Sequence, residues 1–378
     1  MTETTGLTDV LTPHVSKGPV PGAVGLVARG DRVEVAAIGH TDIEGGTPMA
    51  RDSIFRIASI TKPIVAAALM TLVEERRIAL DSPISHWLPE LAAPNVVRDP
   101  AGPIEDVVPA ARPITVEDLL TFRAGWGFPS DFSFPAVQPL FALMDPNHPQ
   151  RVPEPDTWLA SLAGVPLLYQ PGEVWLYNAC SDIQGVLISR MTSNSLPDFL
   201  AERIFEPLGM VDTGFEVPAA KRSRFTSCYV PTPDGGAELV DAPDGDWSRL
   251  PAFPSGAGGL ASTADDWLAF ARMLLAGGGR VLSAESVRLM TTDHLTAEQR
   301  AASGLFTEGE GWGFGGSVDV TRTHPYNVPG RYGWVGGTGT AAHLTPATGT
   351  VSVLMTQLGM AGPTPPQIMR DFWTYAAS

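Results

Sequence analysis

Several features that a chain of 378 residues commonly carries are scarce or missing here. Cysteine occurs twice, at Cys180 and Cys228, and the N-terminus has no basic start followed by an apolar run. We therefore expect no disulfide framework, no secretory leader and a cytoplasmic location. No run approaches 18 consecutive apolar residues, which argues against a membrane span. With 25 basic against 41 acidic residues, the net charge of −16 disfavours nucleic acid and anionic membranes as partners.

Several signatures of common enzyme classes are also missing. The chain contains no Gly-x-Ser-x-Gly, so the nucleophile turn of the α/β-hydrolases is not available. It contains neither His-Glu-x-x-His nor the phosphate-binding Gly-x-x-x-x-Gly-Lys-Ser/Thr pattern. The seven histidines, at positions 14, 40, 86, 148, 294, 324 and 343, are scattered, with no pair at ligand spacing near a cysteine cluster. We expect no metal and no cofactor.

Apolar periodicity predicts strands at both ends of the chain and helices between them. Alternation over residues 24–37, around a turn at Arg29-Gly30-Asp31, predicts a hairpin. From residue 59 to about 80 the spacing is helical, and Pro63 requires the helix to begin near Ser59 to Lys62. Further helices are predicted at 181–192 and 196–205, the second capped by Ser195, and near the C-terminus. Strands are predicted at 341–344 and 350–356.

Proline and capping patterns complete the predicted organisation. Residues 89–113 and 127–155 are rich in proline and predict two long loops. Capping boxes at 115–118 and 263–266 predict two more helices, the second closed by the glycines at 277–279. Strands from both termini with helices between them indicate an α/β or α+β fold. We expect one catalytic domain over 1–378, with an α/β subdomain of about 1–80 and 250–378 and a helical subdomain of about 81–249.

One tetrad, Ser59-Ile-Thr-Lys62, carries chemistry. At helical spacing, residues three apart share a face, so the amine of Lys62 can reach the hydroxyl of Ser59. A lysine shielded from water loses proton affinity, and the neutral amine can then activate the serine as a nucleophile. The helix N-terminus adds a positive dipole end where an oxyanion would form. The alternative, a surface helix with Ser59 as its cap, leaves unexplained why a lysine should sit in a mostly apolar helix.

The surrounding residues resemble the serine β-lactamase-related superfamily, in the branch of class C β-lactamases, DD-peptidases and family VIII carboxylesterases. The resemblance rests on residues 55–62, 72–75, 80–83, 87–90, 114–120, 204–210 and 258–263 and on the Gly-rich C-terminal strand. It implies a β-lactamase/transpeptidase-like fold, an antiparallel sheet flanked by helices with an inserted helical subdomain. It also implies that Ser59 is the nucleophile and that Lys62 is the base that activates it.

The family's second and third motifs are matched with departures. Tyr177 aligns with the motif tyrosine and, beside a lysine ammonium, is expected to favour phenolate and relay protons, but Ala179 replaces the motif asparagine. Trp334-Val335-Gly336 stands where lactamases carry Lys-Thr-Gly and is similar to the Trp-Gly-Gly of family VIII esterases. The resemblance implies that the backbone N–H groups of Ser59 and Gly337 form the oxyanion hole.

Loss of the Lys-Thr-Gly cation removes the partner of a β-lactam carboxylate, while an indole offers apolar surface to an ester. We therefore expect Trp334, Val335 and Gly336 to bind substrate. Trp126 either lines the pocket or packs in the core. Asp182 follows Tyr177 by five residues and either belongs to the binding site or supports its loop.

The expected function is hydrolysis of carboxylic esters through an acyl-enzyme on Ser59, with a small-molecule ester as partner. Acyl transfer to an alcohol or amine, and hydrolysis of amides as in β-lactamases and DD-peptidases, are alternatives on the same site. A non-catalytic sensor that keeps this fold is the alternative from another class. The sequence predicts no oligomeric state.

Overall fold

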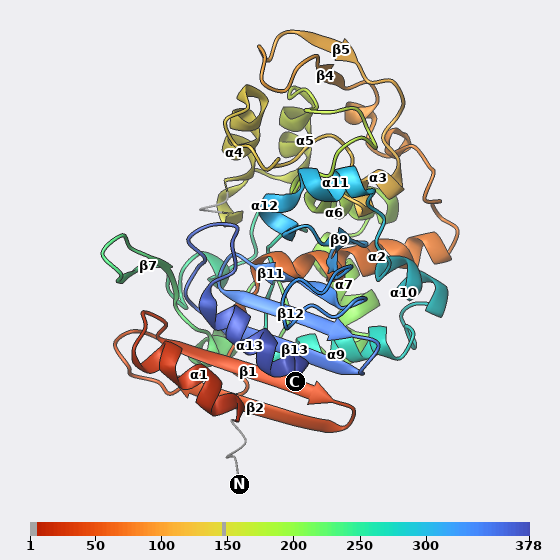
Figure 1. The fold of residues 1–378 in the computed structure, drawn as a ribbon. Coiled ribbons are helices and arrows are strands. Elements are labelled where there is room, and N and C mark those ends of the chain that lie inside the picture. The colour runs from red at the N-terminus through yellow and green to blue at the C-terminus, as the bar shows by residue number, and fades with distance from the viewer. Residues whose placement is uncertain (1–5, 146–148) are drawn as a thin grey trace.

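A seven-stranded antiparallel sheet is assembled from both ends of the chain (Figure 1). The computed structural model describes residues 6–145 and 149–378. The strand order is β2-β1-β13-β12-β11-β10-β9, so the two N-terminal strands pair directly with the last strand of the chain. The strands are β1 (Gly22–Arg29), β2 (Arg32–Gly39), β9 (Gly311–Trp312), β10 (Ser317–Val318), β11 (Tyr332–Gly336), β12 (Thr340–Thr345) and β13 (Thr350–Thr356). The predicted antiparallel sheet and α+β class are confirmed.

Three short strand pairs lie outside this sheet. They are β3 (Phe55–Arg56) with β8 (Ala261–Ser262), β4 (Asn95–Val97) with β5 (Val107–Pro109), and β6 (Cys228–Pro231) with β7 (Ala237–Asp241). In Figure 1 the β6–β7 hairpin projects from one side of the molecule.

Helices cover both faces of the sheet. On one face, α1 (Leu7–Ser16) contacts β1 and β2, α13 (Gln367–Ala377) contacts β13, and the two helices pack together. On the other face α9 (Ala264–Leu275) contacts β1, β12 and β13. The remaining helices are α2 (Lys62–Glu74), α3 (Val116–Leu120), α4 (Gln138–Met144), α5 (Pro155–Ala163), α6 (Ala179–Thr192), α7 (Leu196–Leu200), α8 (Glu206–Leu208), α10 (Ala284–Met290), α11 (Ala297–Ala302) and α12 (Gly304–Thr307). No helix in residues 6–145 and 149–378 has the length and apolar character needed to span a membrane.

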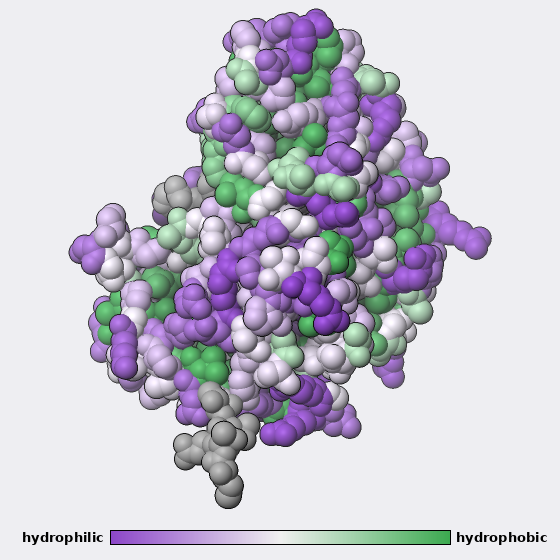
Figure 2. Space-filling view, in the orientation of Figure 1, coloured by the Kyte–Doolittle hydropathy of each residue, from purple (hydrophilic) through white to green (hydrophobic). Residues whose placement is uncertain are grey.

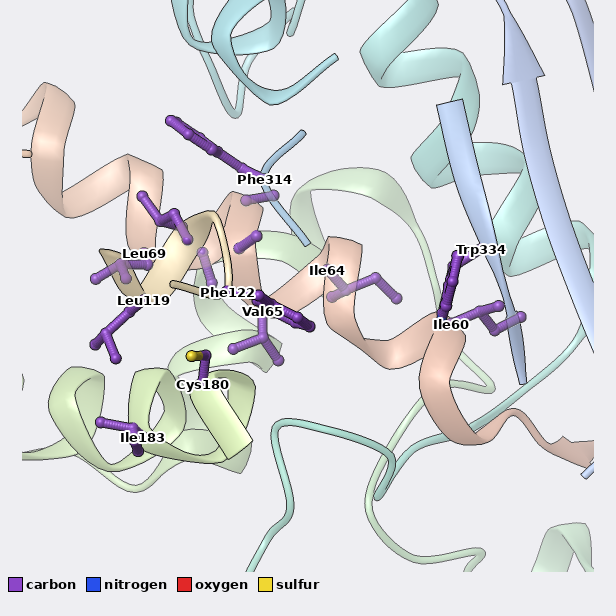
Figure 3. Close-up of a cluster of buried hydrophobic side chains, with 14 of the residues drawn as sticks. Ile60, Ile64, Val65, Leu69, Leu119, Phe122, Cys180, Ile183, Phe314 and Trp334 are labelled. Carbon is purple, nitrogen blue, oxygen red and sulfur yellow. The ribbon is translucent and has the colours of Figure 1, made fainter. Parts of the chain in front are cut away.

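Helix α2 runs through the main core. Its residues from Lys62 to Leu72 are all buried, because it packs against α6 and the sheet rather than facing solvent. Figure 3 shows Cys180 and Ile183 of α6 and Leu119 of α3 beside the apolar side chains of α2. The expected helix reached about residue 80, but α2 ends at Glu74 since Arg76 adopts a left-handed backbone with φ of 57°. The first residue of this buried helix is Lys62, the last residue of the tetrad, so the packing of α2 fixes the position of the lysine.

The local predictions have mixed outcomes. The β1–β2 hairpin is confirmed, and Gly30 supplies the positive φ of 58° that its two-residue turn needs. Both long loops are wrong in part, because 89–113 contains the β4–β5 hairpin and 127–155 contains α4, which tolerates Pro139 in its first turn. Residues 146–148 of the second loop lie outside the described residues. The subdomain boundaries near 80 and 250 stay a prediction.

The structure also shows the outcome of the predicted helix caps. The box at Thr115 is complete, with reciprocal bonds to Asp118, and Ser195 caps α7, which continues through a π-helical turn at Ala201–Phe205. Thr263 caps α9, but the second arm of its predicted box is wrong. The Asp266 carboxylate instead accepts hydrogen bonds from Asp212 N and Thr213 Oγ1, which ties α9 to the preceding chain.

Candidate active site

Ser59 lies on a 3₁₀ turn, Ala58–Thr61, that leads directly into α2. The residue before it, Ala58, has φ of 43°, a left-handed conformation that costs energy for a residue with a Cβ. Two threonine hydroxyls hold the residues before this turn in place. Thr338 Oγ1, between β11 and β12, donates to Arg56 O at 2.5 Å, and Thr340 Oγ1, at the start of β12, donates to Ile57 O at 2.9 Å. The strained turn is therefore fixed against the edge of strand β11.

The Lys62 side chain is buried, and its amine is hydrogen-bonded to the Ser59 hydroxyl. Its Nζ lies 2.8 Å from Ser59 Oγ and donates at 2.6 Å to Ala257 O, and the side chain has no exposed area. Burial penalises the charged amine and lowers the pKa of Lys62 to about 7, an effect that the nearby Asp182 carboxylate partly opposes. A large share of the amine is therefore neutral at neutral pH, as a base for Ser59 must be.

Tyr177 reaches the same serine from a different segment. A reciprocal backbone pair with Phe128 holds its main chain, and the next residue, Asn178, adopts an unusual backbone with φ of 84°. The phenol is hydrogen-bonded with the Ser59 side chain and accepts from Trp334 Nε1 at 2.7 Å. Ser59, Lys62 and Tyr177, separated by up to 118 positions, therefore meet around one hydroxyl.

The expected phenolate form of Tyr177 is wrong. Burial raises the pKa of the Tyr177 phenol to about 12, although its hydrogen bonds to Ser59 and Trp334 act in the opposite direction. The Lys62 amine lies over the tyrosine ring, 4.7 Å from its centroid, rather than being paired with the oxygen. The group is therefore protonated at neutral pH and is available as a proton donor.

Asp182 holds the loop that Lys62 contacts. Its Oδ1 accepts hydrogen bonds from Ser255 Oγ at 2.7 Å and from Ala257 N at 3.0 Å, and Ala257 O in turn accepts from Lys62. Burial raises the pKa of the Asp182 carboxyl against these hydrogen bonds and the charge of Lys62. Of the two interpretations considered from the sequence, the contacts of Asp182 support the loop-supporting one.

A cavity of about 690 Å³ opens on the serine. Its lining is drawn from several walls: Arg56, Ala58, Ser59, Phe128, Met144, Tyr177, Asn178, Asp182, Cys228, Tyr229, Val230, Glu238, Leu239, Val240, Asp241, Trp247, Ser255, Ala257, Gly258, Gly337, Thr338, Gly359 and Met360. Ser59 and Gly337 both border this space, and a Cβ added at Gly337 would meet no atom within 4 Å. Their arrangement is compatible with the expected oxyanion hole, which stays a prediction.

Two predicted substrate-binding tryptophans have other roles. Trp126 is fully buried and donates from Nε1 to Val165 O at 2.8 Å, so it belongs to the core. Trp334 is also buried and is absent from the cavity lining, because its indole packs on Tyr177 and Trp312 and holds the Tyr177 hydroxyl. These contacts favour the core interpretation of Trp126, and they give no support to the prediction that the Trp334 indole binds substrate, which stays a prediction.

The two residues after Trp334 do not line the cavity either. Val335 packs against the two main apolar clusters. At Gly336 an added Cβ would lie 2.4 Å from Ile57 O and 2.2 Å from Thr340 Oγ1, so glycine permits the close approach of β11 to the segment before Ser59. Trp334, Val335 and Gly336 therefore pack against the residues that form the site and do not themselves border the cavity.

An ion pair in the cavity wall was not predicted. Arg56 donates to the Asp241 carboxylate and, at 2.6 Å, to Thr226 O, while its guanidinium stacks over the Phe225 ring at 4.0 Å. Among the described residues that line the cavity, Arg56 is the one arginine or lysine, and Asp241 neutralises it. In the sequence, the only indication of this ion pair is an arginine within an apolar segment. Asp241 lies 185 positions away, so the pairing itself could not be predicted.

This arrangement supports nucleophilic acyl substitution. It combines a hydroxyl, a neutralisable amine, a protonated phenol and main-chain N–H groups beside one cavity. Across residues 6–145 and 149–378, no three or more His, Cys, Asp or Glu side chains come together as metal ligands. The expectation of a cofactor-free reaction stays a prediction.

Comparisons with known proteins point to one family. The family model described as "Beta-lactamase" matches residues 7–366. Protein Rv1367c of Mycobacterium tuberculosis is 40% identical over 357 residues, covering 90% of this chain and 86% of that protein. Esterase EstB of Burkholderia gladioli is 32% identical over 368 residues, with 90% and 88% covered. The solved structure of EstCE1, titled a hydrolase with promiscuous acyltransferase activity, has a TM-score of 0.80 at 24% identity, with 98% and 97% covered.

Proposed function

The chain belongs to the beta-lactamase family, and on that premise we propose that it hydrolyses carboxylic esters through a covalent acyl-enzyme on Ser59. The observation that carries the proposal is the enclosed Lys62 amine, 2.8 Å from Ser59 Oγ with a pKa of about 7. Burying a lysine costs folding free energy, and groups buried at such a cost cluster at functional sites. Beside a hydroxyl, the neutral amine can accept the hydroxyl proton. The similarity to Esterase EstB supports the choice of esters.

The mechanism assigns one proton step to each group. Ser59 Oγ attacks the ester carbonyl while Lys62 Nζ takes its proton, and the N–H groups of Ser59 and Gly337 stabilise the oxyanion. The Tyr177 phenol, protonated because its pKa is about 12, gives a proton to the departing alcohol oxygen and regains one from the Lys62 ammonium. Water then attacks the acyl-Ser59 ester while Lys62 takes a proton from it. The Lys62 ammonium returns this proton to Ser59 Oγ as the acyl–oxygen bond breaks and the acid leaves.

Ester chemistry is favoured over β-lactam chemistry by what surrounds these groups. Ala179 is a fully buried helix residue at the position of the motif asparagine, so it offers no amide to a β-lactam side chain. Arg56, the cation of the lining, is already paired with Asp241, so a β-lactam carboxylate has no free partner among the described lining residues. Both features support the finer assignment to the family VIII carboxylesterases.

A substrate panel tests the proposal. Short-chain p-nitrophenyl esters are expected to be hydrolysed with a kcat/KM at least about tenfold above that for the β-lactam nitrocefin, the factor that one lost binding interaction of about 1.4 kcal/mol produces. Faster turnover of nitrocefin than of every ester would contradict the assignment. Adding methanol to the same assay separates hydrolysis from acyl transfer, because transfer yields the methyl ester in place of the acid.

The pH dependence gives a second prediction. Since Lys62 must be neutral to accept the Ser59 proton, kcat/KM should rise with pH through an apparent pKa of about 7. The Asp182 carboxylate raises the pKa of Lys62, so Asp182→Asn, which keeps an oxygen for Ser255 and Ala257, should move this rise to lower pH. The measurement is kcat/KM for p-nitrophenyl butyrate from pH 5 to pH 9.

Ser255→Ala is the matched control. It removes one hydrogen bond to Asp182 and leaves the charge, so the midpoint of the pH profile should stay in place even if the rate falls. A uniform loss of rate in Asp182→Asn, with the same midpoint as the wild type, would show that Asp182 acts on loop geometry alone.

A further inference from the structure

The cavity extends well beyond the reacting groups, and one of its walls is the β6–β7 hairpin. Tyr229 and Val230 of β6 and Leu239 and Val240 of β7 line it, and none of these residues contacts the Ser59 hydroxyl. The mechanism proposed above uses none of them. The hairpin therefore adds apolar surface to the active-site space for which the reaction itself has no use.

This apolar surface is exposed. Six large apolar side chains of the described residues are exposed, and Val230, Leu239 and Val240 of the hairpin are half of them. In Figure 2 the projecting tip of the hairpin is mostly purple and white, and green side chains lie nearer to where this region joins the rest of the molecule. Leu239 pairs across the strands with Tyr229, so the two side chains share a face, yet Tyr229 is buried and Leu239 is 53% exposed. Leu239 thus sits on the inner face with much of its surface uncovered by protein.

A chain of main-chain hydrogen bonds joins the hairpin to the oxyanion side of the site. Tyr229 exchanges bonds with the segment after β13, donating to Gln357 O at 2.8 Å and accepting from Gly359 N at 2.7 Å. The next residue, Met360, donates to Gly337 O at 2.8 Å. The proposed leaving-group donor Tyr177 belongs to another wall, where it pairs with Phe128.

We propose that the β6–β7 hairpin is the subsite for the hydrocarbon chain of the acyl group, which runs from Ser59 past Gly337 and Met360 onto Leu239. The inference rests on the proposed esterase function and specifies its substrate class as esters of uncharged alkanoic acids longer than acetate. Glu238, on the same hairpin, also lines the cavity and is exposed with no ion-pair partner among the described residues. Its charge repels an acyl chain that ends in a carboxylate.

The test is a series of p-nitrophenyl esters from acetate to octanoate, which varies the acyl chain and keeps the alcohol fixed. In the wild type, kcat/KM should rise by up to about fourfold for each methylene that becomes fully buried, and then level off. Leu239→Ser should flatten this rise, so that its loss of kcat/KM on octanoate exceeds its loss on acetate by the factor that the wild type gains between the two esters. Val211→Ser, at an exposed apolar residue outside the cavity lining, is the matched control and should keep the wild-type series.

An equal loss on acetate and octanoate in Leu239→Ser would overturn the subsite, and so would a wild-type rate that falls from acetate onward. Methyl alkyl ketones of the same chain lengths provide an arm without turnover, measured by calorimetry on Ser59→Ala. If the long ketones bind no more tightly than acetone, the subsite is wrong whatever the esterase assays give. If they bind more tightly while no ester is hydrolysed, the proposed function fails and the subsite stands.

Discussion

Ser59→Ala is expected to lower kcat/KM for p-nitrophenyl butyrate by on the order of 10⁴-fold or more, the scale that follows removal of a serine nucleophile. The reason is that Ser59 Oγ is the proposed nucleophile: without it, Lys62 has no hydroxyl proton to take, and no acyl transfer occurs that would produce a leaving group for Tyr177 to protonate. KM should change little, because the apolar walls that bind the substrate remain. Steady-state kinetics on the purified variant measures both constants.

Ser255→Ala is the control for this substitution. It removes another hydroxyl of the same cavity, which donates to Asp182 and accepts from Ala257 N and is not bonded to Lys62, and it should cost about tenfold, the scale of one or two hydrogen bonds. A Ser59→Ala variant that keeps more than a few per cent of wild-type activity would mean that the nucleophile has been misassigned.

Lys62→Met is expected to have the second-largest effect, a loss of about 10²- to 10⁴-fold in kcat, as is typical when a general base is removed. Methionine fills the enclosed space with an apolar chain of similar length, so the core around α2 should survive. The rise of kcat/KM with pH near 7 should disappear together with the amine. Thermal unfolding of the variant checks that the fold is intact.

Lys62→Arg separates a base from a fixed positive charge. Arginine keeps the charge, but it stays protonated throughout the accessible pH range and therefore cannot take the serine proton. It should be as inactive as the methionine variant. An arginine variant with substantial activity would mean that position 62 contributes charge stabilisation, not proton transfer.

The contact between Ser59 and Lys62, the proposed nucleophile and base, is predictable because its geometry is local. A separation of three residues at a helix start fixes the approach of Lys62 to Ser59 without help from the rest of the chain. The strands at both termini are predictable for a similar reason, since alternation and short turns define them. Tyr177 is different, since its link to Ser59 is tertiary and only the resemblance to a known family pointed to it.

What could not be predicted depends on distant partners. Trp334 was expected beside the substrate and Trp126 either there or in the core. Each indole N–H instead donates to a partner from another segment, Tyr177 Oη for Trp334 and Val165 O for Trp126. The predicted phenolate form of Tyr177 was wrong. The sequence revealed a nearby cation, but it did not reveal the burial that raises the pKa of the phenol. The apolar hairpin wall was invisible, since exposed apolar residues have no periodicity that marks a cavity.

The most direct test of the central claim is the mass of the protein during turnover. Rapid acid quenching of wild-type protein with p-nitrophenyl butyrate, followed by intact-protein and peptide mass spectrometry, should show one butyryl group on the peptide that carries Ser59. The signal should be absent from Ser59→Ala. A butyryl group on another residue, or its persistence in Ser59→Ala, would contradict an acyl-enzyme on Ser59.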